Sequence, residues 1–169
     1  TTAPTLSSGP SVSGITTKKA KISWSTSRSA DSKVAYGTSS GSYNTEEPSS
    51  SSQVTDHEIN LTGLTAGTTY YYKAKWTDED GNTGESEEKS FVTEAAPTVF
   101  DVSAENVGLT SGIIQYTVKG ASKVKIYYGT TTSFGAVKEV STSTSETTYT
   151  TQLADLDDGT KYYYKINTF

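Results

Sequence analysis

The chain has 169 residues and a net charge of −5, it contains no cysteine or methionine, and serine and threonine make up roughly a third of it. These values exclude a disulfide framework and thiolate metal sites, and they argue against nucleic acid as the main partner. No apolar run approaches the roughly 18 residues of a membrane-spanning helix, so we expect no membrane insertion within this segment. Because the chain begins at Thr1 without a methionine, we expect a mature or excerpted segment in which targeting signals cannot be read.

Alternating apolar and polar residues predict short strands along the first half of the chain. The expected strands, after a first one within residues 1–12, cover residues 20–24, 32–36, 57–61, 70–76 and 87–93. The inward set contains Trp24, Tyr36, Tyr70 and Trp76, whereas Ala35 should face outward. Residues 78–82 form a polar hairpin loop, and no segment has a helical period. This pattern is typical of a β-sandwich.

The second half repeats the first at a constant spacing of 92 residues. Leu64 to Lys73 returns as Leu156 to Lys165, and Trp24 corresponds to Tyr116. Duplication at domain length predicts two copies of one fold in tandem. We therefore expect an all-β chain of two sandwiches, with residues 1–94 as the first domain and residues 95–169 as the second.

The second copy lacks a counterpart of residues 78–93, so we expect it to be C-terminally incomplete in this sequence. Two explanations are open. Either the closing strand follows in the natural chain, or a neighbouring molecule supplies it by β-augmentation and links subunits into a filament.

The corner motif Leu-x-x-Gly-Thr-x-Tyr, read from Leu64 to Tyr70, resembles that of fibronectin type III domains. The resemblance implies that the hydroxyls of Tyr70 and Tyr162 bind backbone a few residues upstream, with Gly67 and Gly159 making the turns. The Tyr-Gly-Thr-Ser motif at residues 36–39 is similar to the bacterial variant of the domain. It is also similar to the sandwich that precedes the catalytic domain of purple acid phosphatases.

Few residues suggest catalysis or metal binding. His57 is the only histidine, which excludes a multi-histidine metal site, and its counterpart Tyr149 indicates a packing role. Residues 78–82 superficially resemble a calcium loop, but the glycine comes too early and strands flank the loop, so a tight hairpin is the favoured interpretation. Glu85, Glu87 and Glu88 extend this acidic tip, which we interpret as a solvated edge that resists aggregation. We expect no cofactor and no metal.

Two polar features are candidates for modification. Asn60 begins an Asn-Leu-Thr sequon and is a candidate glycosylation site on an outward-facing position. The segments at residues 48–52 and 141–148 are rich in serine and threonine. They are interpreted as flexible polar connections, with O-glycosylation as the alternative.

One face of each copy combines lysine with tyrosine, and we name it the Lys/Tyr face. Its members are Lys33, Tyr71, Lys73, Lys75, Lys123, Lys125, Tyr127, Tyr163 and Lys165. Such a face on an acidic molecule could meet an acidic partner or a neighbouring subunit. The alternative is that these residue types simply suit exposed strands through cross-strand packing.

These observations favour a non-catalytic structural or adhesive repeat module of an extracellular surface protein, such as a stalk or filament segment. Its partners would be proteins, namely neighbouring repeats or subunits, or surface glycans. The alternative is an accessory module of a secreted enzyme that hydrolyses polysaccharides or phosphate esters. An aromatic carbohydrate-binding platform is disfavoured, because Tyr71, Tyr127 and Tyr163 are few and flanked by lysine.

Overall fold

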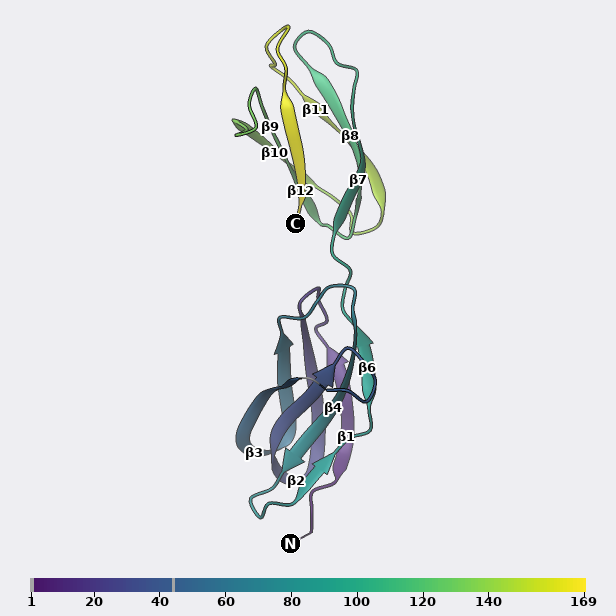
Figure 1. Ribbon diagram of the computed structural model, residues 1–169, viewed down its shortest axis with the longest axis vertical. Helices are drawn as coiled ribbons and strands as arrows, with labels where there is room; N and C mark the ends of the chain where they lie inside the picture. Colours follow the sequence, from purple (N-terminus) through teal and green to yellow (C-terminus); the bar gives the residue numbers. More distant parts are fainter. Residues whose placement is uncertain (1, 44) are drawn as a thin grey trace. The chain divides into compact units, whose positions relative to one another are not determined.

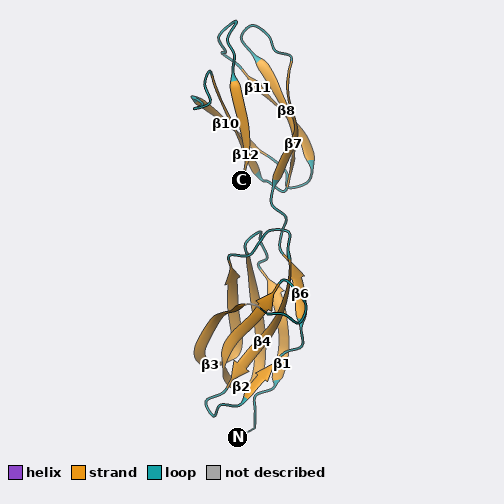
Figure 2. Ribbon diagram, viewed as in Figure 1, coloured by secondary structure: helices purple, strands orange, loops and turns teal. Residues whose placement is uncertain are grey.

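The computed structural model describes residues 2–43 and 45–169, and it leaves the side chains of residues 45–48 undescribed. The described chain contains strands and loops, with no helix among these residues (Figures 1 and 2). It divides into two compact units, Thr1–Ala95 and Ala96–Phe169. Both units are all-β, as the sequence predicted.

The first unit has six strands. They are β1 (Leu6–Ser13), β2 (Lys19–Gly37), β3 (Thr45–Thr62), β4 (Thr69–Thr77), β5 (Thr83–Glu85) and β6 (Lys89–Val92). All of the pairings are antiparallel: β2 lies between β1 and β3 in its first half, and between β3 and β4 in its second. β5 and β6 both pair with β4.

The long strand β2 takes part in both layers of the first sandwich. It pairs with β1 up to Thr26 and with β4 from Lys33 onward, and its register with β3 shifts between Ser25 and Ala30. The sequence predicted two separate strands here, at residues 20–24 and 32–36. The structure joins them because the chain bends from one layer to the other without leaving the extended conformation.

The core of the first unit contains the predicted inward residues, with two differences. Trp24, Tyr70 and Trp76 are buried, but Tyr36 is only half-buried at the margin of the core. The prediction that Ala35 faces solvent is wrong, since its exposure is 0%. Ala35 lies opposite Lys73 on the central strand β2, which has β3 on one side and β4 on the other.

The second unit has six strands in two three-stranded sheets. They are β7 (Thr98–Glu105), β8 (Gly112–Lys119), β9 (Lys123–Gly129), β10 (Ala136–Ser141), β11 (Thr147–Leu153) and β12 (Tyr163–Thr168). One sheet has the order β10-β9-β12 and the other has the order β11-β8-β7. Tyr116, Val118, Val124 and Ile126 are fully buried between them.

Both tyrosine corners that the resemblance implied are present. The Tyr70 hydroxyl accepts a hydrogen bond from the Thr65 backbone N–H at 2.9 Å. The Tyr162 hydroxyl accepts the equivalent bond from Asp157 at 3.0 Å. In each unit a side chain therefore fixes the turn that precedes a long strand, and this prediction is confirmed.

Left-handed backbone conformations recur at the repeat spacing of 92 residues. Six glycines in the described part of the first unit have a positive φ, and at four of them the second unit keeps a positive φ at the counterpart position. The pairs are Gly9 and Asp101, Gly14 and Asn106, Gly63 and Asp155, and Gly67 and Gly159. Asparagine and aspartate are the non-glycine residues that tolerate this region best, so the second unit keeps the bends with different residues.

The glycine that ends β2 is required by a close approach of the backbone. A methyl carbon at Gly37 would lie 2.2 Å from the carbonyl oxygen of Ser42, because the following turn folds back onto the strand end. The counterpart Gly129 would place its methyl carbon 2.7 Å from the backbone nitrogen of Gly135. The Tyr-Gly-Thr motif thus marks a strand end against which the next loop packs.

Candidate functional site

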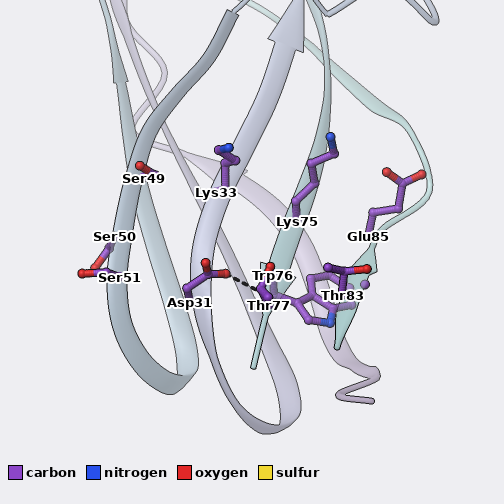
Figure 3. A pocket seen from close by; sticks show the side chains of 11 residues that line it. Asp31, Lys33, Ser49, Ser50, Ser51, Lys75, Trp76, Thr77, Thr83 and Glu85 are labelled. Carbon is purple, nitrogen blue, oxygen red and sulfur yellow. Dashed lines mark hydrogen bonds between the residues drawn. The ribbon is translucent and has the colours of Figure 1, made fainter. Parts of the chain in front are cut away.

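The outer face of the first unit carries a groove of about 650 Å³. Side chains from four neighbouring strands line it: β3, the second half of β2, β4 and β5 (Figure 3). Lys33 and Lys75 project from adjacent strands to the same side, with Ser49 to Ser51 on one flank and Glu85 on the other. Two members of the predicted Lys/Tyr face therefore lie in the same groove.

The strand register aligns the groove residues in one row. Lys33 is the cross-strand partner of both Ser49 and Lys75, and Lys75 is the partner of Glu85. The row thus reads Ser49–Lys33–Lys75–Glu85 across four strands, with two like charges at its centre. Like charges directly opposite each other on a sheet are unfavourable for folding.

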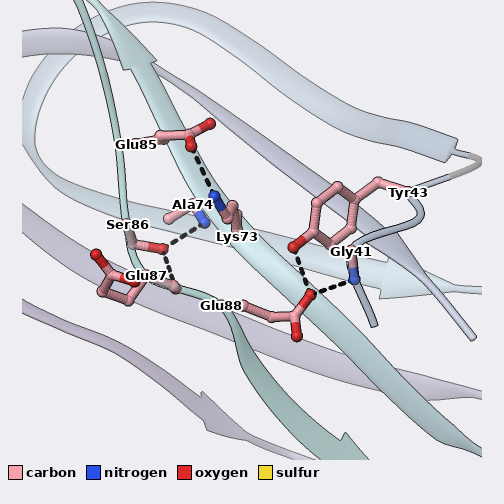
Figure 4. Close-up of polar contacts among 8 residues, drawn as sticks. All are labelled: Gly41, Tyr43, Lys73, Ala74, Glu85, Ser86, Glu87 and Glu88. Atoms are coloured by element: carbon pink, nitrogen blue, oxygen red, sulfur yellow. Dashed lines mark hydrogen bonds and ion pairs between the residues drawn. The ribbon is translucent and has the colours of Figure 1, made fainter. Parts of the chain in front are cut away.

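The acidic groups around the groove have partners within the first unit. One carboxylate oxygen of Asp31 accepts a hydrogen bond from the Thr77 backbone N–H at 2.6 Å. Glu85 forms an ion pair with Lys73 at 2.7 Å (Figure 4), and this hydrogen bond raises the pKa of Lys73. Tyr71, the remaining member of the Lys/Tyr face in the first unit, is half-buried opposite Gly37 on the same layer.

The equivalent lysines of the second unit pair with a carboxylate on the adjacent strand. Glu139 of β10 contacts Lys125 at 2.7 Å and Lys123 at 3.2 Å. Its hydrogen bonds to these lysines lower the pKa of Glu139, and the bond to Glu139 raises the pKa of Lys125. Asn167 replaces the second lysine of the row, so the second unit has the row Glu139–Lys125–Asn167.

Lys165, the remaining lysine of the Lys/Tyr face in the second unit, lies close to two aromatic rings. The ammonium of Lys165 lies 5.0 Å from the ring centroid of Tyr127 and 5.1 Å from that of Phe134. Lys161 lies 4.8 Å from the ring centroid of Tyr163. These distances are in the cation–π range, so lysine and tyrosine contact one another on this sheet.

Glu88 lies immediately before β6 and is hydrogen-bonded to the turn after β2. Its carboxylate accepts hydrogen bonds from the Gly41 backbone N–H at 2.8 Å and the Tyr43 hydroxyl at 2.5 Å (Figure 4), and a third from the Ser40 hydroxyl at 2.6 Å. The hydrogen bonds from Ser40 and Tyr43 lower the pKa of Glu88. Desolvation and the bond to Glu88 raise the pKa of Tyr43 to about 12. Glu88 is half-buried by these contacts, whereas Glu85 and Glu87, which the sequence interpretation placed with it on a solvated edge, are exposed.

His57 is a packing residue, as predicted. Its ring stacks on Trp24 with the centroids 4.8 Å apart, and each ring nitrogen lies 2.8 Å from a hydroxyl, Nε2 from Thr26 and Nδ1 from Ser32. Thr26 donates its only hydroxyl proton to the Arg28 carbonyl oxygen, so it accepts from His57 Nε2–H, and Nδ1 accepts from Ser32. Burial lowers the pKa of His57, although nearby Asp56 and Asp31 act in the opposite direction.

Residues 78–82 form the expected tight turn. Oδ1 of Asp78 accepts hydrogen bonds from the backbone N–H groups of Asp80 and Asn82 and from the Asn82 side chain. These bonds lower the pKa of Asp78. Among the residues that the structure describes, no group of three or more His, Cys, Asp or Glu side chains could hold a metal ion.

The candidate glycosylation residue Asn60 is exposed on β3 opposite Lys21, in the layer formed with β1.

Sequence reasoning missed the serines of the groove. Residues 48–52 were interpreted as a flexible connection, but they belong to β3. Serine runs have low strand propensity, so only the register of β3 against β2 reveals this strand. The described residues form no helix that is long and apolar enough to cross a membrane.

Comparison with known proteins supports the sequence resemblance. Residues 10–93 match the family described as the purple acid phosphatase N-terminal domain. Among solved structures, the chain is similar to the FN1–FN3 domains of chicken contactin (CNTN1). That likeness has 17% identity and a TM-score of 0.45, and it covers 99% of this chain and 60% of that one.

The chain is also similar to a two-domain fibronectin type III segment of chicken tenascin. The identity is 19% and the TM-score is 0.41, with 96% of this chain and 90% of that chain covered. No curated protein sequence matches the chain. The family match confirms the resemblance of the first unit to the phosphatase sandwich.

Proposed function

We propose that this chain is a non-catalytic structural or adhesive repeat module of an extracellular surface protein. The observation that carries the proposal is the Lys/Tyr face, because lysine and tyrosine recur at equivalent outward positions of two units. Lys33 corresponds to Lys125, and Tyr71 corresponds to Tyr163. Repeated modules that keep one surface are suited to spanning distance while presenting that surface several times. Its partners would be neighbouring repeats, other subunits or surface glycans.

The internal contacts of each unit suit a load-bearing role. Tyr70 and Tyr162 each fix a turn to a strand, and Glu88 fixes a further turn of the first unit. Such side-chain hydrogen bonds between turns and strands oppose local opening of a small domain. A segment of a stalk or filament would gain resistance to proteolysis from them.

Surface labelling tests this proposal. An antibody raised against the 169-residue chain should bind intact cells of the source organism, and external protease should remove the signal. Labelling that requires permeabilised cells would refute the extracellular assignment. The purified chain should also show no hydrolase turnover, and turnover that disappears on substitution of one of its residues would refute the non-catalytic assignment.

A second candidate function is an accessory module of a secreted enzyme that hydrolyses phosphate esters or polysaccharides. The match of residues 10–93 to a phosphatase sandwich favours it. Sequencing the full reading frame discriminates the two functions, because the accessory module requires a catalytic domain in the same chain. If such a domain exists, deleting residues 1–169 should change substrate binding or stability more than the chemical step.

A further inference from the structure

The edge strand β11 of the second unit lacks the features that commonly protect a free strand edge. It lies at the margin of the sheet β11-β8-β7, and among the described strands it pairs with β8 alone. The pairing continues through all seven residues of Thr147–Leu153 without a register shift. Proteins keep open edges from joining with charged side chains, proline or bulges. The opposite edge, β7, carries Asp101 and Glu105 and has a register shift, whereas β11 has no charge, proline or bulge.

The backbone of β11 has hydrogen-bonding groups on this open side. Lys138 of β10 donates to the Gln152 carbonyl oxygen at 2.7 Å, so that oxygen points away from β8. The backbone groups of an antiparallel strand point to one side and then to the other at alternate residues. The N–H and C=O groups of Thr148 and Thr150 therefore also point to the open side. Lys138 covers the end of the edge at Gln152, and both threonines are exposed.

The first unit carries charges at the same edge positions. At the repeat spacing of 92 residues, Thr148 corresponds to Asp56 of β3. Thr150 corresponds to Glu58, and both acidic residues are exposed. Two such edges side by side would set carboxylates opposite each other, which is unfavourable. The second unit keeps the strand and has threonine at both positions, although the net charge of the whole chain is −5.

We propose that β11 pairs with β11 of a second copy of this chain, so that two three-stranded sheets join into one. A two-fold axis at Tyr149 sets Thr148 of one copy opposite Thr150 of the other, and the reverse. Each of these pairs exchanges N–H···O bonds in both directions, because both residues point to the open side. These central pairs do not need the Gln152 carbonyl, to which Lys138 already donates.

The side chains of β11 match a second copy of the same strand. On the outer face, the Thr148 and Thr150 hydroxyls of the two copies meet, and threonine pairs of this kind stabilise antiparallel strands. On the inner face the two Tyr149 rings meet. Tyr149 is half-buried, with its ring centroid 6.0 Å from that of Tyr116, so pairing extends an aromatic contact that already exists. The edge is therefore complementary to itself, as a two-fold interface requires.

This inference rests on the proposed role as a structural repeat module, and it names a second copy as the partner. One strand edge buries less surface than the standard interface of about 1,600 Å², so we expect weak association, with a Kd of about 0.1 mM. Sedimentation equilibrium of the 169-residue chain between about 10 µM and 1 mM covers this range. The mean mass should rise with concentration from 18.0 kDa toward twice that value. A mass that stays at 18.0 kDa throughout would overturn the inference.

Matched variants locate the contact. Thr148→Asp combined with Thr150→Glu gives β11 the carboxylates of the first unit and should weaken association by about tenfold or more. The fold accommodates such residues, since Asp56 accepts a hydrogen bond from a serine on the adjacent strand of the first unit. Thr130→Asp combined with Thr132→Glu adds the same charge to the exposed turn after β9 and should leave association unchanged.

Equal weakening by the two double variants would assign the effect to net charge and overturn the inference. Thermal melts identify a variant that has lost its fold, and Thr150→Glu alone then replaces the double substitution. A mixture of the acidic variant with the variant Thr148→Lys and Thr150→Lys should regain association, because opposite charges then face each other across the two-fold axis. Failure of this mixture to associate more than either variant alone would also count against the contact.

Cysteine pairs test the register. The chain has no cysteine of its own, so Thr148→Cys and Thr150→Cys each introduce a single thiol. Residues in a hydrogen-bonded antiparallel pair have Cα atoms about 5.5 Å apart, within the range of a disulfide. Oxidation of an equal mixture should give disulfides between the two variants in excess of those within either one. Random pairing, or an excess of Thr150→Cys joined to itself, would overturn the proposed axis.

The proposed function fails differently. A chain that stays monomeric can still label on intact cells, and a chain that associates through β11 can fail to label.

Discussion

Replacing Gly37 with alanine tests whether a close contact, rather than a special conformation, requires glycine at the end of β2. The added methyl carbon would lie 2.2 Å from the Ser42 carbonyl oxygen and 3.3 Å from Tyr43 Cα. Non-bonded heavy atoms pack at about 3.5 Å, so the backbone at Ser42 would have to move by about 1 Å. The contact is with backbone, which cannot rotate away as a long side chain can.

The expected cost follows from two opposing effects. Overpacking with a backbone shift costs about 1–3 kcal/mol and occasionally more. Alanine also reduces the conformational entropy of the unfolded chain, which offsets only about 0.4–1 kcal/mol of this cost. The displaced turn also carries Gly41 and Tyr43, which donate hydrogen bonds to Glu88. We therefore expect the Gly37→Ala substitution to lower the free energy of unfolding by about 3 kcal/mol.

Urea unfolding followed by tryptophan fluorescence measures this effect, because both tryptophans lie in the first unit. Gly14→Ala is the matched control, since Gly14 has a positive φ of 57° and no atom within 4 Å of the added methyl carbon. The Gly14→Ala substitution should cost only the free energy of placing alanine in the left-handed conformation, about 1 kcal/mol. If Gly37→Ala is no less stable than Gly14→Ala, the close approach does not determine the residue.

Three further predictions concern polar contacts. Tyr70→Phe should destabilise its unit by about 1–2 kcal/mol, because it removes the acceptor of a partly buried N–H, whereas the more exposed Tyr162→Phe should cost about 0.5 kcal/mol; equal costs in urea unfolding would contradict this. Glu88→Gln should lower the pKa of Tyr43 from about 12 toward its ordinary value near 10. Ultraviolet titration detects the change, and an unaltered pKa would show that Glu88 has no influence on the phenol. Burial lowers the pKa of His57, so the folded state disfavours the proton that the unfolded state takes up. The stability of the first unit should be full above pH of about 6.5 and should fall as the pH decreases from there toward the folded pKa. His57→Gln should flatten this dependence in urea unfolding between about pH 5 and 8, and a slope that survives the substitution would assign it to other groups.

The core was readable from the sequence because a strand alternates its faces with a period of two. Trp24, Tyr70 and Trp76 share the phase of their apolar neighbours, and all three are buried. The tyrosine corners were readable because their motif is local, with Tyr70 only five positions after Thr65. Ala35 escaped the same reasoning, because burial of a small side chain depends on its neighbours across the sheet.

The groove and the Glu88 contact depend on strand register, which local patterns do not determine. Ser49 faces Lys33 only because β3 continues past its predicted start, through residues that read as a loop. Glu88 reaches Tyr43 and Gly41 from more than 40 positions away in the sequence. A polar pattern indicates that such side chains face solvent, but it does not name the polar group beside them.

The left-handed corners shared by the two units bear on how further copies of this domain can be recognised. At three of the four pairs, glycine in one unit stands where aspartate or asparagine stands in the other. A comparison that scores identity counts these as mismatches, although the chain turns with the same hand at each of them. For this fold, glycine, asparagine and aspartate at those four sites form one equivalence class, and a search pattern that groups them would detect diverged copies that identity alone overlooks.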